Sequence, residues 1–434
     1  MPLTDLKSKF SGKELKFDRS LKFFKSKYHL IISVACLTFW LLLFLVWNNF
    51  NVYHVDFHIF HEAFKKILNN PKELYDIDID GWGYYYLPSF ACFFSFLGFF
   101  NLKLAACIFL IINYILSIVF ILLLNRIMRL MNLKNKWHRL LFLLLVSNGW
   151  IIFDQFRTLQ TKLLVSLIFL CIIWREIYYR IEEKEKKISY FTLHYIFFIF
   201  ALGMVPQLIF LFIIYLFHEI RFSNFFNRDN IFRYLIVVSI FLIENLLFLV
   251  HPELISDFLK GFTRNFDEKS IRALFLSDFQ IYNKTILNII RYAMLFLTIL
   301  IMLGLTINKR ILIEWKFSLF CFSFLYLDIF RGYGILQILL PFILLLFIPF
   351  IKQEKSIKRF LKKNYIILIG LFSMLGIIFT SKDTQVFLRA LPLFKEFPLF
   401  ILVYLRWSFL TGLLATTIII LNFKFKTLSP FFRE

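Results

Sequence analysis

Asp56 is an acidic residue whose position in the sequence suits a general base. It lies shortly after the first long apolar run, residues 28–47. A carboxylate within hydrogen-bond reach of a hydroxyl can accept its proton while the hydroxyl attacks an electrophile. Residues 57–68 carry apolar side chains at helical spacing, which predicts an amphipathic helix along a membrane surface. Because Asp is also a favoured N-cap, a catalytic carboxylate and a helix cap both remain open for Asp56.

Other side chains near Asp56 have the chemistry of metal ligands. They are three histidines and three aspartates of one segment: His54, His58, His61, Asp76, Asp78 and Asp80. The alternating aspartates have a spacing that can bind a divalent cation, but the segment lacks the length and carbonyl pattern of an EF-hand loop. The histidines have helical spacing, yet no glutamate completes a familiar zinc motif in frame. We assign no metal ligand, expect no cofactor and leave open whether a divalent metal assists.

Apolar helices are the elements that must position these residues. Of the 434 residues, 60% are hydrophobic, whereas a soluble domain is nearer half apolar. The apolar runs are spread along the whole chain, and a run of about 20 residues crosses a bilayer as a helix. We therefore predict an all-α polytopic membrane protein with about 11–13 transmembrane helices and interfacial helices on the outer face.

The charge distribution predicts how the chain crosses the membrane. The formal net charge is +22, and the basic residues cluster in short segments between apolar runs. This is typical of cytoplasmic loops and does not indicate nucleic-acid binding. Residues 1–27 carry eight Lys and Arg against three acids, whereas residues 48–84 carry six acids against three lysines. We expect a multi-pass protein of the cell membrane with both termini cytoplasmic.

The predicted organisation is a single transmembrane domain with two large outer loops. Residues 1–27 form a basic cytoplasmic segment, residues 28–423 the transmembrane domain and residues 424–434 a cytoplasmic tail. The outer loops are residues 48–84 and 251–287.

Two apolar segments are too short or too interrupted for a simple span. Residues 86–100 are about 15 long, which predicts a half-membrane or interfacial helix on the outer side. Residues 189–219 lie between two basic segments and contain Gly203 and Pro206. They predict a hairpin of two short helices with its tip near Met204–Gln207, an arrangement that often marks a binding site in membrane proteins.

The first outer loop resembles the GT-C glycosyltransferase superfamily, and within it the polyprenol-phosphate-mannose-dependent α-1,2-mannosyltransferase-like branch. An Asp after the first span is followed by an aromatic residue, Ala, Leu-Tyr-Asp and Tyr-x-Pro at the entrance to a membrane helix. The matching residues are Asp56, Phe60, Ala63, Leu74, Tyr75, Asp76, Tyr86 and Pro88. Leu87 stands where the family often has another proline.

Two further segments in the first half of the chain are similar to the family in the same order. The segment LQTKLL from Leu159 resembles Gly-Gln-x-Asn-Leu-Leu: Gln160 matches, and Leu159 and Lys162 replace Gly and Asn. The segment GMVPQ from Gly203 resembles a Lys-Pro-Gln hairpin tip. Gln207 matches there, as does Pro206, while valine replaces the lysine.

The resemblance extends into the second half of the chain. The segment RNFDEKSIRAL from Arg264 resembles an Asn-x-Ser-x-x-Gly/Ala segment of the second outer loop. The segment RGYGILQILLP from Arg331 resembles a late segment that leads to a proline within a span. The family often has a histidine there, and Tyr333 and Gln337 are the nearest polar residues.

The resemblance implies transfer of a hexose such as mannose from a polyprenyl-phosphate donor to a glycan or glycolipid acceptor. It places the reaction on the outer face, with membrane lipid around it and Asp56 as the base. The lipid phosphate leaves with negative charge, which cationic side chains would stabilise. The expected substrate-binding residues are His58, Tyr86, Gln160, Lys162, Gln207, Arg264, Arg272, Tyr333 and Gln337.

Other functions remain open at the level of sequence. A lipid or solute transporter or flippase would usually show internal symmetry between halves, and none stands out. A polysaccharide polymerase or ligase would also join lipid-linked sugars outside the membrane, usually around a large late loop. A non-catalytic assembly partner is a further alternative. The length of the product, one sugar or many, separates a transferase from a polymerase.

Overall fold

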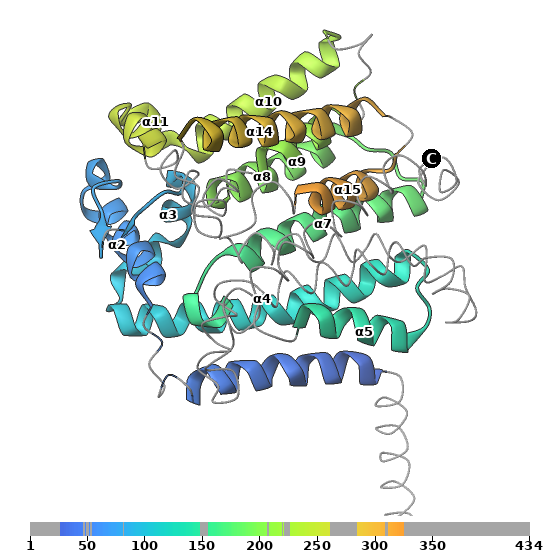
Figure 1. Ribbon diagram of the computed structural model, residues 1–434, viewed down its shortest axis with the longest axis horizontal. Helices are drawn as coiled ribbons and strands as arrows, with labels where there is room; N and C mark the ends of the chain where they lie inside the picture. The colour runs from blue at the N-terminus through green and yellow to red at the C-terminus, as the bar shows by residue number, and fades with distance from the viewer. Residues whose placement is uncertain are drawn as a thin grey trace, which may run out of the picture.

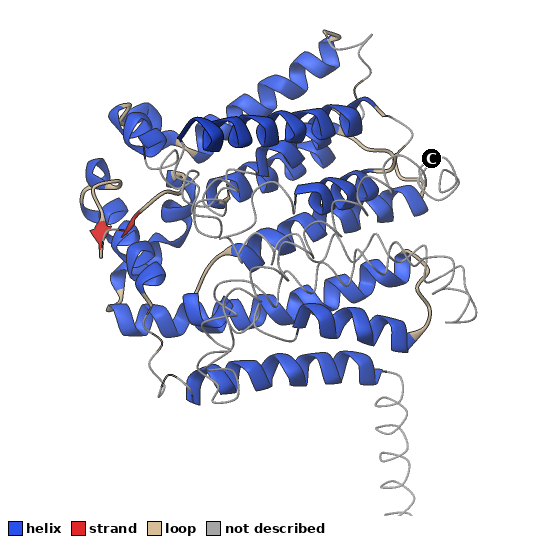
Figure 2. Cartoon of the chain, in the orientation of Figure 1, coloured by secondary structure: helices blue, strands red, loops and turns tan. Residues whose placement is uncertain are grey.

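The structure is a computed structural model, and its described part is mostly helical. It describes residues 27–46, 48, 52, 54–80, 82–147, 155–205, 208–218, 220, 226–260, 284–308 and 311–324. Its elements in chain order are the helix Lys27–Val46, α2 (Val55–Asn69), η1 (Pro71–Glu73), β1 (Asp78–Ile79), β2 (Trp82–Gly83), α3 (Pro88–Phe94), η2 (Ser95–Phe99), α4 (Leu102–Leu130), α5 (Lys136–Ser147), α7 (Lys162–Ile181), α8 (Ile188–Met204), α9 (Ile209–Leu216), α10 (Arg228–Glu244), α11 (Leu246–Val250), α14 (Lys284–Ile307) and α15 (Ile313–Phe324). The strands β1 and β2 form one small antiparallel pair, shown in red in Figure 2.

Most of the longer helices lie side by side with their axes along one direction (Figure 1). The helix Lys27–Val46 lies below α4, followed upward by α7, α8 and α14. Within the described part, Lys27–Val46 and Leu102–Leu130 are long and apolar enough to cross a membrane. Both match predicted spans. The predicted spans after Phe324, the tail and most of the second outer loop lie outside the described residues.

The first outer loop forms a separate group of short elements at one end of this bundle, on the left in Figure 1. A helix over residues 57–68 is confirmed as part of α2, and the short segment 86–100 is helical, as α3 followed by η2. That either lies at a membrane surface stays a prediction. The apolar face of α2 is covered by protein. Phe60 packs against Phe90 of α3 with ring centroids 5.2 Å apart, and Phe57 packs against Phe109 of α4 at 5.3 Å.

The predicted hairpin of two short helices is also confirmed. Helix α8 ends at Met204 and α9 begins at Ile209. The two helices run antiparallel, because Phe198 packs against Phe212 at 5.4 Å while His194 hydrogen-bonds to Tyr215. The chain therefore reverses direction after Met204, where the sequence predicts the tip.

Candidate functional site

The carboxylate of Asp56 contacts a residue that lies 104 positions away in the chain. The side-chain amide of Gln160 donates a hydrogen bond to Asp56 Oδ2. Asp56 belongs to the first turn of α2, where the helix dipole favours an anion, and Gln160 lies in the turn that precedes α7. With 34% of its side chain exposed, Asp56 remains accessible to a ligand. Two residues predicted from separate segments thus meet at one place.

The N-cap interpretation of Asp56 is wrong. Helix α2 begins at Val55, and its N-cap is His54, whose Nδ1 accepts a hydrogen bond from the backbone N–H of Asp56 at 3.2 Å. The same Nδ1 lies 3.9 Å from Asp56 Oδ2. Because Nδ1 already accepts the backbone hydrogen bond, His54 acts here as a helix cap. The side chain of Asp56 is therefore left for other contacts.

The turn that carries Gln160 is braced against α4. Gln155 is buried, and its side-chain amide donates to Asn113 Oδ1 of α4 at 3.0 Å and to the carbonyl oxygen of Gln160. Between them, Leu159 is fully buried and has a φ of 50°. This left-handed backbone is uncommon for any residue except glycine. It turns the chain so that Gln160 reaches Asp56 and α7 can begin at Lys162.

Tyr86 contributes an aromatic wall close to the carboxylate. Its ring lies 5.1 Å from Phe60 and 5.3 Å from Phe90, and its carbonyl oxygen accepts a hydrogen bond from the Tyr75 hydroxyl at 2.9 Å. Burial raises the pKa of Tyr86, and the negative charge of Asp56 raises it further. The Tyr86 hydroxyl therefore stays protonated at neutral pH and can donate a hydrogen bond.

The predicted hairpin tip lies against the segment that carries Tyr86. The backbone N–H of Leu87 donates to the carbonyl oxygen of Gly203 at 2.9 Å. A Cβ built on Gly203 would lie 2.6 Å from Ser89 Oγ, so a larger residue at this position would require the Ser89 hydroxyl to move. Three of the predicted segments, those of Asp56, Gln160 and Gly203, thus converge at one end of the bundle.

The histidines do not converge as a metal site. His61 is buried, and its Nε2 donates to the carbonyl oxygen of Phe100 at 2.9 Å. His58, an expected substrate-binding residue, lies half-buried with Nε2 3.9 Å from Glu62 Oε1. Within the described part of the chain, no group of three His, Cys, Asp or Glu side chains is placed to hold a metal ion.

The remaining predicted residues fall into two groups. Lys162 is the half-buried first residue of α7, two positions after Gln160. The others lie outside the described residues: Gln207, Arg264, Arg272, Tyr333 and Gln337.

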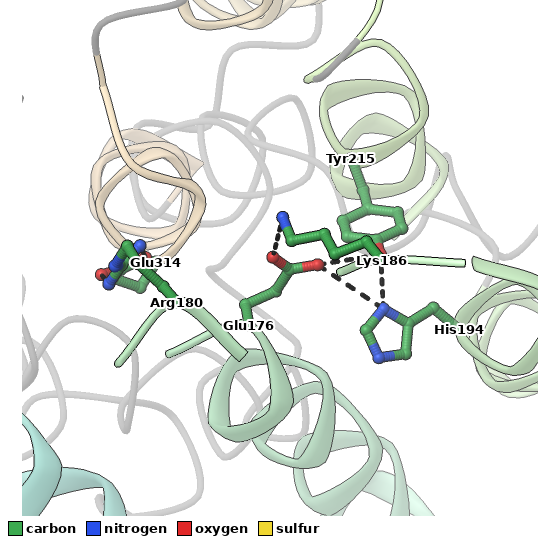
Figure 3. Close-up of polar contacts among 6 residues, drawn as sticks. All are labelled: Glu176, Arg180, Lys186, His194, Tyr215 and Glu314. Carbon is green, nitrogen blue, oxygen red and sulfur yellow. Dashed lines mark hydrogen bonds and ion pairs between the residues drawn. The ribbon is translucent and has the colours of Figure 1, made fainter. Parts of the chain in front are cut away.

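A second polar cluster, which the sequence did not reveal, lies among α7, α8, α9 and α15 (Figure 3). Buried Glu176 of α7 accepts a hydrogen bond from the Tyr215 hydroxyl at 3.1 Å and pairs with Lys186 at 2.9 Å. His194 Nδ1 lies 3.7 Å from the same carboxylate. Nearby, Arg180 pairs with buried Glu314 of α15. The sequence does not predict this cluster, because Glu176 and Lys186 belong to a charged segment of the kind that usually forms a solvated loop.

Comparison with known proteins leaves the chain without an assigned family. No family model matches it, and no curated protein matches it significantly in sequence.

Proposed function

We propose that this protein is a membrane glycosyltransferase of the GT-C type that transfers a hexose from a polyprenyl-phosphate donor. The observation that carries the proposal is the contact between Asp56 and Gln160. The sequence points to Asp56 by its position after the first apolar run, and the resemblance independently implies Gln160 as a substrate-binding residue. The Leu159 backbone adds support, because its left-handed φ suits the glycine that the resembled segment carries there.

The arrangement around Asp56 suits the removal of a proton from an acceptor hydroxyl. Gln160 holds Oδ2, which leaves Oδ1 to accept the proton as the hydroxyl oxygen attacks the anomeric carbon. The bond between that carbon and the phosphate oxygen breaks, and the lipid phosphate leaves with the bonding electrons. Lys162 is the cation nearest in sequence to Gln160. Arg264 and Arg272 of the second outer loop are the other cations proposed for the leaving phosphate.

A membrane setting is required by such a donor, whose polyprenyl tail needs lipid. The two helices with the length and composition of a span give limited support for it. We propose the full arrangement predicted from the sequence, with about 11–13 spans, both termini cytoplasmic and the Asp56 end outside.

Sugar transfer by the purified protein in lipid vesicles tests the proposal. Labelled polyprenyl-phosphate mannose and a mixed glycan and glycolipid acceptor pool are supplied to wild type, Asp56→Asn and Asp78→Asn. Asp78 is exposed on β1 in the same loop, so its variant is a matched control. We expect Asp56→Asn to lower the rate roughly 100-fold or more, as loss of a general base does. The control should keep the wild-type rate, and both variants should keep the wild-type Tm.

The other outcomes are informative. Equal transfer by wild type and Asp56→Asn removes Asp56 as the base but keeps the enzyme. Donor binding without transfer indicates another sugar or acceptor. Absence of donor binding by wild type contradicts the proposal, and a product of many sugars indicates a polymerase or ligase.

A transporter or flippase is the second candidate, and the buried Glu176 cluster favours it. Ionisable side chains within apolar helices often mark ion or substrate pathways. Flux of a solute or lipid through reconstituted vesicles that Glu176→Gln abolishes and Asp56→Asn leaves unchanged would establish this alternative.

A further inference from the structure

A basic pocket lies at the end of the bundle opposite Asp56. It forms where the helix Lys27–Val46 and α5 begin and α4 ends, on the right in Figure 1. Its lining residues are Lys27, His29, Asn125, Arg129, Asn132, Lys134, Lys136 and Arg139. Five of these are cationic, and none of the described lining residues is acidic. The cavity of about 530 Å³ is in the range of small-molecule sites.

The pocket wall contains a buried guanidinium N–H that lacks an acceptor within the described part of the chain. Arg139 is only 6% exposed, and its Nε has no hydrogen-bond partner among the described residues. An unmatched buried donor on a charged group is costly, and an anionic ligand oxygen would relieve that cost. His29 is also buried, oriented by a 3.1 Å contact between its Nε2 and Asn125 Oδ1. With Nε2 as the donor, Nδ1 of the neutral ring is an acceptor, so Arg139 and not His29 is the buried group that an anion would satisfy.

The backbone around the pocket shapes it for an anion. Asn132 has a φ of 69°, which turns the chain sharply between α4 and α5, and Asn tolerates this conformation. Helix α5 begins at Lys136, so its N-terminal end, with partial positive charge, lies at the pocket. One arginine guanidinium group can donate two parallel hydrogen bonds to a phosphate. The pocket lining contains two arginines, Arg129 and Arg139.

Neighbouring aromatic residues indicate where the anion comes from. Trp137 is 68% exposed beside the pocket, and its ring lies 5.2 Å from that of Tyr28. Trp and Tyr gather at the boundary between membrane and water. We propose that this pocket binds a phosphate-bearing anion, with the phosphate head group of an anionic membrane lipid as its source. Under the proposed topology this lipid belongs to the cytoplasmic leaflet, but binding itself does not depend on the proposed transferase activity.

A pair of charge-matched double variants distinguishes a built site from a generally basic surface. Arg129 and Lys134 are exposed lining residues, so Arg129→Gln/Lys134→Gln should fold normally. Arg228→Gln/Lys187→Gln removes one Arg and one Lys from exposed positions outside the pocket lining. Dissociation constants are measured for the full-length protein in non-ionic detergent. The probes are dioctanoyl phosphatidic acid, dioctanoyl phosphatidylcholine and inorganic pyrophosphate.

We expect saturable binding of phosphatidic acid to wild type and to the control, and binding at least about tenfold weaker to the pocket variant. Phosphatidylcholine should not compete. If pyrophosphate binds as tightly as the lipid, the phosphate chemistry stands and the source is a soluble anion. Absence of saturable binding, or equal weakening in both double variants, overturns the proposal. None of these outcomes bears on sugar transfer at Asp56, so the two proposals fail separately.

Discussion

At the scale of single residues, Leu159 combines a favourable contribution to stability with an unfavourable one. Burial of its side chain stabilises the fold, whereas its left-handed backbone conformation destabilises it. The side chain is fully buried, so replacing it with Ala should cost about 2–5 kcal/mol. The conformation itself costs a non-glycine residue about 1–2 kcal/mol. We therefore expect Leu159→Gly to be more stable than Leu159→Ala by about 1 kcal/mol, as measured by denaturant unfolding in detergent.

Leu163 supplies the control for that comparison. It is buried in the first turn of α7, where the backbone is helical. There Gly should be less stable than Ala by about 1 kcal/mol, the usual helical order. The same order at both positions would contradict the strain at Leu159.

His61 should make stability depend on pH. Burial lowers its pKa, and the positive charge of Lys65 lowers it further, while the hydrogen bond to the Phe100 carbonyl opposes the shift. In the unfolded chain the histidine has a pKa of about 6.5. As the pH falls, the unfolded chain therefore takes up a proton at His61 before the folded chain does. Stability should fall as the pH drops below about 6.5. His61→Gln keeps a donor for Phe100 and removes the titration. Its Tm between pH 7.5 and 5.5 should change less than that of wild type, and parallel Tm profiles would contradict this role.

The sequence predicts which residues belong to the candidate site better than it predicts which of them are in contact. The type and order of residues along the chain point to Asp56 and Gln160, but the sequence does not show that they touch. Their contact depends on Gln155 bracing the turn against Asn113, a buried hydrogen bond between segments 42 positions apart. Glu176 shows the converse, because its burial follows from the packing of α8, α9 and α15 around it. Periodicity along one helix does not report such packing.

At the scale of elements, helical periodicity and chain breaks predicted most of the described structure. The amphipathic pattern predicted α2, and Gly203 with Pro206 predicted the break between α8 and α9. What covers α2 was not predictable, because Phe57 and Phe60 have the same spacing whether they face lipid or protein. In the structure, the aromatic side chains of α3 and α4 cover them.

The approach of α8 to α3 is a contact between elements that glycine makes possible. Gly203→Ala would bring a methyl group within 2.6 Å of Ser89 Oγ. Because Ser89 Oγ must move aside, the cost should reach at most about 1–3 kcal/mol, and the variant should have a lower Tm. Ser89→Ala removes that oxygen, and the next contacts of the new Cβ, at 3.6 and 4.0 Å, are ordinary. The double variant should therefore regain most of the stability. A double variant as unstable as Gly203→Ala would show that the two elements do not approach closely here.

At the scale of the whole molecule, charge and chemistry are segregated to opposite ends of the bundle. The end that holds Asp56 carries the acidic loop, and the opposite end carries the basic pocket of Lys27, Arg129 and Arg139. The sequence predicted this polarity through the distribution of basic residues. It did not predict the pocket, because a cluster of cations between helix ends requires three segments to meet.

This polarity predicts which residues a membrane-impermeant reagent can reach. Lys72 of η1 and Lys184, after α7, are both exposed, and they lie on opposite sides of the proposed membrane. Each is changed to Cys in a background whose five native cysteines are replaced, after confirming that this background is expressed. An impermeant maleimide should label Lys72→Cys in intact cells and Lys184→Cys only after the membrane is opened. The reverse pattern would place Asp56 in the cytoplasm, where a polyprenyl-linked sugar presented on the outer face could not reach it. Labelling of both in intact cells would contradict the membrane crossing between them.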